Sequence, residues 1–302
     1  MNIKREISGT LSWFVVLAIL VIFSAGLLQA AQISAASVEK QMSPEQLVQE
    51  MVRNEIRSQT GGQVYWRFRE IEKKDGVAKT YQVYETPGGT VRMLLAVNGE
   101  PLSPSQRQSQ LARLQKLLKN PAHARRYAKA RHHDGQKERK LLAMLPNAFL
   151  FQYDGTQDNL VRVKFVPNPS FQPPTREAQV FHHMAGQILI DPNQKRLAEI
   201  DGQLTSEVRF FWGLLGHLDK GGTFEVRQTH LNSGYWQMSD LRVNMHGVAL
   251  FFETIGVQEN QRYEDYHRNP PGMTLHDAIL QLEHTAYSAD AAISKANRVA
   301  RK

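Results

Sequence analysis

The sequence predicts an α+β fold: a strongly curved antiparallel sheet of about eleven strands, an incomplete barrel with helices on its concave side. Segments that alternate apolar and polar residues recur along the chain and are separated by Gly, Asn and Asp turns. Helical spacing of apolar residues occurs near the start, in the middle and at the end. Because a long sheet must cover one face, the helices are expected to pack against it.

The composition is that of a globular protein with an ordinary packed core. The chain has 302 residues, of which 41% are hydrophobic and 9% aromatic. These values exclude an intrinsically disordered chain. The absence of cysteine excludes disulfides and a lipid-attachment cysteine.

The first 36 residues have the layout of an export signal. Lys4 and Arg5 precede an apolar run at residues 11–28, and small residues follow at 34–36. Cleavage before Ser37 would release the rest. Alternatively, the run is long enough to stay as a membrane anchor. In both cases residues 37–302 are expected to form a single domain outside the cytoplasm.

A helix and a three-stranded meander are predicted next. Ser43, Pro44 and Gln46 form a capping box for a helix over residues 43–58. The predicted strands and the short turns between them favour antiparallel neighbours. The strands cover residues 63–72, 79–86 and 90–97.

Residues 104–145 are predicted to form a basic helical insertion. They hold eleven basic and only two acidic residues, so their net charge of +9 accounts for the +8 of the whole chain. Leucines at helical spacing favour two helices, interrupted at Asn120-Pro121.

Strands resume after this insertion, and a helix ends the chain. A proline-rich connection at 166–178 is not expected to form regular structure. The C-terminal helix is predicted over residues 274–302. The predicted strands cover residues 149–153, 160–166, 187–191, 197–204, 223–231, 235–245, 248–255 and 257–266.

Apolar residues that point inward from the strands are the candidate hydrophobic ligand-binding cavity, since a curved sheet offers a concave mouth. The alternative is that they form ordinary core beneath packed helices. The candidates are Trp66, Phe68, Val83, Phe149, Phe151, Phe165, Phe224 and Phe252. A second group of candidates comprises Phe210, Phe211, Trp212 and Trp236.

The basic insertion is the candidate anionic-surface site. Phospholipid headgroups at a membrane are the expected partner, and nucleic acid is not, because an exported protein rarely meets it and aromatic side chains are scarce here. The alternative is a solvated helical face. The candidate residues are Arg125, Arg126, Lys129 and Arg131.

Catalytic, cofactor and metal motifs do not occur. The adjacent pairs His132-His133 and His182-His183 have poor chelating geometry. Hydrolase and nucleotide-binding motifs are missing. We therefore expect a protein that is not an enzyme and that needs no cofactor or metal.

Four segments carry a resemblance to a known family. They are PNPSFQPPTREA (167–178), GQILIDPNQKRLAEIDGQL (186–204), GGTFEVRQTHLNSGYWQMSDLRVNMHG (221–247) and YEDYHR (263–268). Together they resemble a family of exported bacterial proteins whose fold is similar to the outer-membrane lipoprotein carriers LolA and LolB and the envelope-stress regulator RseB. The resemblance covers roughly residues 43–270. Its most specific part runs from Gly186 to Asp201.

The resemblance implies a periplasmic half-barrel with a hydrophobic cavity. One hypothesis is a carrier that holds the acyl chain of a lipid or lipoprotein and touches an anionic membrane surface. The other is an envelope sensor or interaction module, similar to RseB, that binds a protein partner. The carriers hold acyl chains by an apolar surface rather than by a short motif, so the resemblance assigns no individual residue.

Overall fold

A computed structural model of the chain describes residues 42–60, 62, 64–119, 136–175, 177–210, 216–232, 234–249 and 253–286. Several predictions fall outside these residues. They concern the export segment, the candidate cavity residues Phe252, Phe211 and Trp212, and the four candidate cations of the basic insertion. Among the helices in the described ranges, none has the length and apolar character to cross a bilayer.

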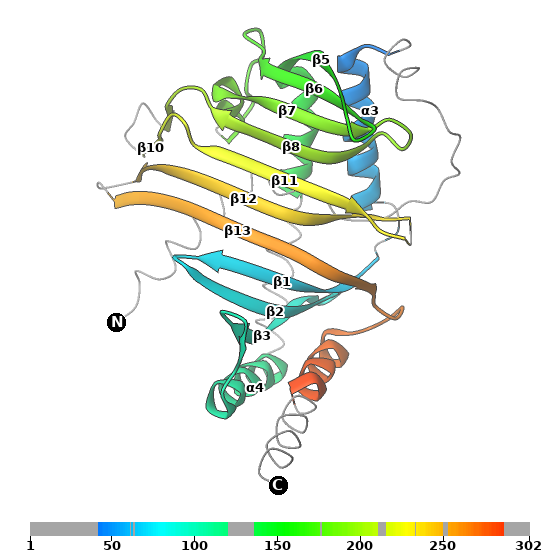
Figure 1. Ribbon diagram of the computed structural model, residues 1–302, viewed down its shortest axis with the longest axis vertical. Helices are drawn as coiled ribbons and strands as arrows, with labels where there is room; N and C mark the ends of the chain where they lie inside the picture. Colours follow the sequence, from blue (N-terminus) through cyan, green and yellow to red (C-terminus); the bar gives the residue numbers. More distant parts are fainter. Residues whose placement is uncertain are drawn as a thin grey trace. The chain divides into compact units, whose positions relative to one another are not determined.

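The α+β class and the large antiparallel sheet are confirmed (Figure 1). The strand order is β4-β3-β2-β1-β13-β12-β11-β8-β7-β6-β5, and its two separate ends show that the sheet does not close into a barrel. The strands are β1 (Trp66–Lys74), β2 (Val77–Thr86), β3 (Gly89–Val97), β4 (Glu100–Pro101), β5 (Phe149–Gln157), β6 (Leu160–Pro167), β7 (Met184–Asp191), β8 (Arg196–Leu204), β9 (Val208–Phe210), β10 (Gly216–Leu218), β11 (Thr223–His230), β12 (Trp236–Ala249) and β13 (Glu253–Arg268).

The contacts divide the chain into two compact units. The described residues within 1–63 and 134–260 form unit 1, and those within 64–133 and 261–302 form unit 2. The helical elements are α3 (Pro44–Thr60), α4 (Pro104–Lys119), the 3-10 helix η1 (Glu177–His183) and α-helical residues 136–148 and 275–286.

In unit 1, the sheet buries an apolar face, and α3 packs against it. Val163, Ile188, Ile200 and Val226 follow one another across neighbouring strands in register. Helix α3 runs across β5 to β8 and contacts β5 and β8 (Figure 1). Its start confirms the predicted capping box. The Gln46 backbone N–H donates to Ser43 Oγ at 3.2 Å, and the Ser43 backbone N–H donates to Gln46 Oε1 at 2.9 Å.

The opposite face of the unit 1 sheet carries charges that neutralise one another. Glu225 pairs with Arg227 at 2.7 Å and with Arg242 at 3.0 Å. Arg227 also reaches Glu199 at 3.0 Å. Partial burial raises the pKa of Glu199, and the Arg227 guanidinium opposes that rise. The sheet of unit 1 is therefore amphipathic, with cross-strand ion pairs on its polar side.

Unit 2 contains the predicted meander and its own apolar core. Asp75 and Gly76 join β1 to β2 with φ angles of 50° and 76°, as expected for a tight hairpin. Helix α4 and residues 275–286 lie side by side next to β3 (Figure 1). The core they share consists of Tyr84, Val91, Met93, Leu111, Leu114, Ala278, Ile279, Leu282 and Ala286.

Several predicted strand ends were wrong, and Gly247 shows why. Gly247 falls in the predicted gap between residues 245 and 248, but it lies inside the 14-residue β12. A Cβ at this position would overlap the carbonyl oxygen of His217, which belongs to β10 on the adjacent side of β12. This glycine therefore permits a close approach between strands rather than a turn. Likewise, the break predicted at residue 256 falls within the 16-residue β13.

A second close approach involves Gly186 on β7 and Gly202 on β8, which are cross-strand partners. A Cβ on Gly186 would overlap the Asp201 carbonyl oxygen and lie 2.6 Å from the Gly202 Cα. A Cβ on Gly202 would lie 2.8 Å from the Phe224 ring. The Phe224 ring thus occupies space that only glycine leaves open.

We predict that Gly186→Ala lowers the free energy of unfolding by about 3 kcal/mol, because the new methyl group meets backbone atoms that cannot move aside. Gly222→Ala is the control, since its methyl group would meet the flexible Met245 side chain at 3.1 Å. Its cost should stay below about 1 kcal/mol. Urea unfolding followed by tryptophan fluorescence measures both, and equal losses would contradict the proposed backbone contact.

Candidate functional site

The candidate cavity residues of unit 1 are buried, and three of them form an aromatic cluster. The Phe149 ring centroid lies 4.8 Å from that of Phe165 and 6.4 Å from that of Phe151, in edge-to-face geometry. Phe181 of η1 joins the cluster at 5.4 Å from Phe149. Phe224 is also buried on this unit's apolar face, where its ring lies over Gly202.

The candidate cavity residues of unit 2 are buried as well. Phe68 and Val83 are direct cross-strand partners on β1 and β2. The Tyr266 ring of β13 lies 6.1 Å from Trp66 and 5.0 Å from Phe68. These side chains form a second aromatic group within unit 2, on the side of the sheet opposite Tyr84 and its core.

Trp236 has a different environment from the other aromatic candidates. It packs with Leu189 and Ala198 in a small separate cluster. Its indole Nε1–H donates to Gln194 Oε1 at 2.9 Å, and its ring lies 5.4 Å from that of His230. The hydrogen bond and the separate cluster give Trp236 a structural role at the β7–β8 turn.

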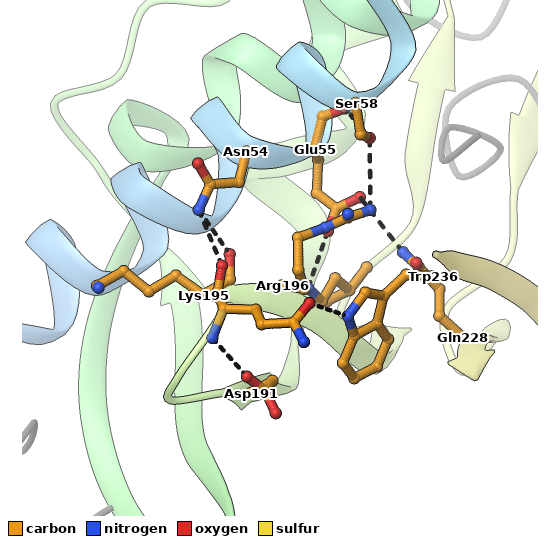
Figure 2. Close-up of polar contacts among 10 residues, drawn as sticks. Asn54, Glu55, Ser58, Asp191, Lys195, Arg196, Gln228 and Trp236 are labelled. Atoms are coloured by element: carbon orange, nitrogen blue, oxygen red, sulfur yellow. Dashed lines mark hydrogen bonds and ion pairs between the residues drawn. The ribbon is translucent and has the colours of Figure 1, made fainter. Parts of the chain in front are cut away.

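The most pronounced polar feature is a buried ion pair between α3 and β8 (Figure 2). Glu55 has no solvent-exposed surface, and its Oε1 accepts hydrogen bonds from Arg196 Nε at 2.7 Å and the Leu197 backbone N–H at 2.9 Å. Oε2 accepts from Arg196 Nη2 at 3.0 Å and from Gln228 Nε2 at 3.5 Å. Arg196 Nη2 also reaches Ser58 Oγ at 3.4 Å.

Hydrogen bonds in the turn between β7 and β8, and from α3 to that turn, hold the chain next to Arg196 in place. Asp191 Oδ1 accepts hydrogen bonds from the backbone N–H groups of Asn193 and Gln194 at 3.0 Å and 2.6 Å. From α3, Asn54 Nδ2 donates to the backbone carbonyls of Gln194 and Lys195 (Figure 2). The turn is therefore attached to the helix by side-chain to backbone bonds on both sides of Arg196.

Chemically, the Glu55–Arg196 pair is a clamp and not a reactive centre. Both carboxylate oxygens of Glu55 accept two hydrogen bonds each, which leaves no lone pair directed at a substrate. The bidentate guanidinium neutralises the buried charge. In the part of the chain that the structure describes, no three His, Asp or Glu side chains come together as a metal site.

Sequence reasoning missed this ion pair, although one signal for it was present. Glu55 falls on the apolar stripe of α3, between Met51 and Ser58, where a charged residue needs a buried partner. Its partner lies 141 residues further along the chain, in the segment that carries the family resemblance. The spacing of residues on α3 could not identify it.

We predict strong coupling between Glu55 and Arg196. Glu55→Leu and Arg196→Met should each lower the free energy of unfolding by about 3–5 kcal/mol, because each leaves one buried charge unpaired. The double variant should lose less than the sum. Urea unfolding of all four proteins measures the coupling. The control is Glu50→Gln, which breaks the exposed Glu50–Arg53 pair on the same helix and should cost less than about 0.5 kcal/mol. Additive losses would disprove the clamp.

Comparisons of the chain with family models, with curated proteins and with solved structures found no match. The likeness to the lipoprotein carriers therefore rests on the sequence segments quoted above.

Proposed function

We propose that the chain is an exported, non-enzymatic carrier that binds the acyl chain of a lipid or lipoprotein in the periplasm. In this proposal the apolar side of a strongly curved half-barrel holds the acyl chain, with the helices on its concave side. Residues 11–28 either direct export and are removed, or anchor the protein to the inner membrane. The basic insertion, with Arg125, Arg126, Lys129 and Arg131, faces an anionic membrane surface.

The observation that supports this proposal best is the amphipathic sheet of unit 1. Its polar side is neutralised by cross-strand ion pairs, whereas its apolar side concentrates Phe149, Phe151 and Phe165. An acyl chain is recognised by apolar area and needs few directed polar groups. Phe171 and His182 are half-buried at the margin of this cluster, and their ring centroids lie 5.9 Å apart. In the proposal, a ligand makes its first contact at this margin.

A second candidate is an envelope interaction module that binds a protein partner, and one observation favours it. Leu150 and Val166 are cross-strand partners at the end of the sheet, and each is 51% exposed. Adjacent exposed aliphatic side chains of this kind are common where a protein partner binds. This pair lies on the face opposite Phe151, so the two functions would use different surfaces.

We expect residues 37–302, purified under native conditions, to carry a co-purified acyl lipid, since the proposed face would be occupied in cells. Native mass spectrometry followed by lipid extraction tests this expectation. The delipidated protein should then bind a fluorescent fatty-acyl probe. An empty, cooperatively folded monomer that binds no probe would contradict the carrier and favour the interaction module.

Two neighbouring residues of β5 provide matched variants for the probe assay. Phe151→Asp places a charge on the apolar face and should weaken probe binding by more than about tenfold. Leu150→Asp places the same charge on the exposed face and should leave probe binding unchanged. Phe151→Trp keeps the face apolar but fills it, so it should also weaken binding even if Phe151→Asp fails to fold. Equal binding by the Asp and Trp variants and wild type would contradict an acyl site here.

A further inference from the structure

Helix α4 presents an exposed surface with positive charge only. Its sixteen residues include four cations and no Asp or Glu. Three of the cations are exposed, and each lies three residues from the next, so they share one side of the helix. We call Arg113, Lys116 and Lys119 the α4 cationic face.

Packing within unit 2 holds α4 so that its cationic face points to solvent. Leu111 and Leu114 on the other side of α4 are buried against Ile279 and Leu282. Arg107, the fourth cation, is buried and donates to the Leu102 carbonyl at 2.8 Å. The Ser103 capping box fixes the start of the helix. The apolar side of α4 is thus used in folding, and only its polar side is available to a partner.

Among the described residues, no ion pair joins an acid to the α4 cationic face. Glu70 and Glu72 on β1 pair with Arg92 of β3 instead. In the helix over residues 275–286, Asp277 accepts from the Thr274 hydroxyl and backbone N–H at the helix start. Glu283 of the same helix is half-buried. Within the described residues, Arg113 donates to the backbone carbonyl of Arg92 rather than to a carboxylate.

We infer that the α4 cationic face docks on an anionic lipid bilayer. The inference rests on the proposed function, because a carrier of acyl chains must approach a membrane, and it assigns that approach to described residues outside the apolar faces. Charge complementarity is its physical basis, since an anionic bilayer strengthens binding by about fivefold for each nearby Lys or Arg.

Such docking is electrostatic and does not involve insertion. Because Leu111 and Leu114 are buried in unit 2, α4 has no apolar side to place among acyl chains. At physiological salt the attraction extends only over a Debye length of about 8 Å. Binding should therefore be reversible, weak on neutral lipid and strongly dependent on ionic strength.

The absence of cysteine allows a direct test by energy transfer in residues 37–302, the form also used for the acyl probe, so that the apolar run at 11–28 cannot itself insert into the vesicles. A donor fluorophore is attached at Gln115→Cys, which is exposed on α4 and leaves its charges intact. Rhodamine-headgroup lipid serves as the acceptor, in vesicles of phosphatidylcholine with or without about 30% phosphatidylglycerol. We expect transfer that requires phosphatidylglycerol and is lost between about 0.1 M and about 0.5 M salt. The same donor at Val77→Cys, in the β1–β2 turn region, should show weaker transfer.

Two charge-matched double variants identify the surface. Lys116→Gln with Lys119→Gln should weaken the anionic-vesicle association by about 30-fold. Lys73→Gln with Lys74→Gln removes the same charge from exposed residues at the end of β1 and should change it by less than about threefold. Equal effects of the two pairs, or equal transfer on neutral vesicles, would overturn the inference. If the α4 variant fails to fold, the salt dependence of energy transfer with unmodified Lys116 and Lys119 still tests the inference.

The two proposals can fail separately. Acyl-probe binding is measured without vesicles and depends on Phe151, whereas vesicle docking is measured without a probe and depends on Lys116 and Lys119. Salt-sensitive docking with no acyl binding would leave the inference standing and refute the carrier. Acyl binding without phosphatidylglycerol-dependent transfer would leave the carrier standing and refute the docking of α4 on a bilayer.

Discussion

A charged side chain on the apolar side of α3 constrains how unit 1 can fold. Removing the Glu55 carboxylate from water costs several kcal/mol, so the helix is stable against the sheet only where donors compensate that charge. Arg196, the Leu197 backbone N–H and Gln228 provide them from β8 and β11. Any rotation of α3 about its axis, or a slip along the sheet, would break this set. An interaction of this kind contributes little net stability, but it selects one docking position from the many that apolar packing alone would allow.

The position of α3 in turn determines which face of the unit 1 sheet is buried from solvent. With α3 against β5 and β8, Val163, Ile188 and Val226 are covered. The alternate residues face outward and form ion pairs such as Arg242–Glu225. A register shift of one residue would exchange these two sets, so the cross-strand pairs and the clamp specify the same arrangement.

Local signals in the sequence were enough to predict the elements whose ends depend on nearby residues. The capping box at Ser43 and the short turns of the meander, of which Asp75-Gly76 is one, were predicted because each feature acts within four residues. The strand ends at Gly247 and residue 256 were not predictable in the same way. A glycine in a sequence favours the prediction of a turn. Gly247 instead lies within a strand, where only glycine leaves room for the backbone of His217 on a different strand. The buried pair shows the same limit, since Glu55 and Arg196 are joined only by the tertiary fold.

The aromatic cluster on β5 was predicted only in part, for a related reason. Alternation along β5 correctly placed Phe149 and Phe151 on one face, and the structure shows them in a buried aromatic cluster. Alternation does not distinguish a packed core from a wall that accepts an acyl chain, because both require buried apolar side chains. Phe181 and Phe171 join this cluster through the 3-10 helix and the proline-rich connection before it. These segments have no periodic spacing of apolar residues from which the contact could be predicted.

The segment with the most specific family resemblance is explained by folding requirements. Gly186 permits a close strand approach, Asp191 forms the turn, and Arg196 compensates Glu55. Its residues therefore say little about chemistry, and function must be sought in how the surfaces differ. The charged face of unit 1 is neutralised within the sheet, so it attracts no particular partner over distance. Among the described residues no carboxylate pairs with the α4 cationic face, and the apolar side of the helix is already buried. A surface of this kind favours weak, reversible attachment to an anionic layer, which is what the proposed carrier would require.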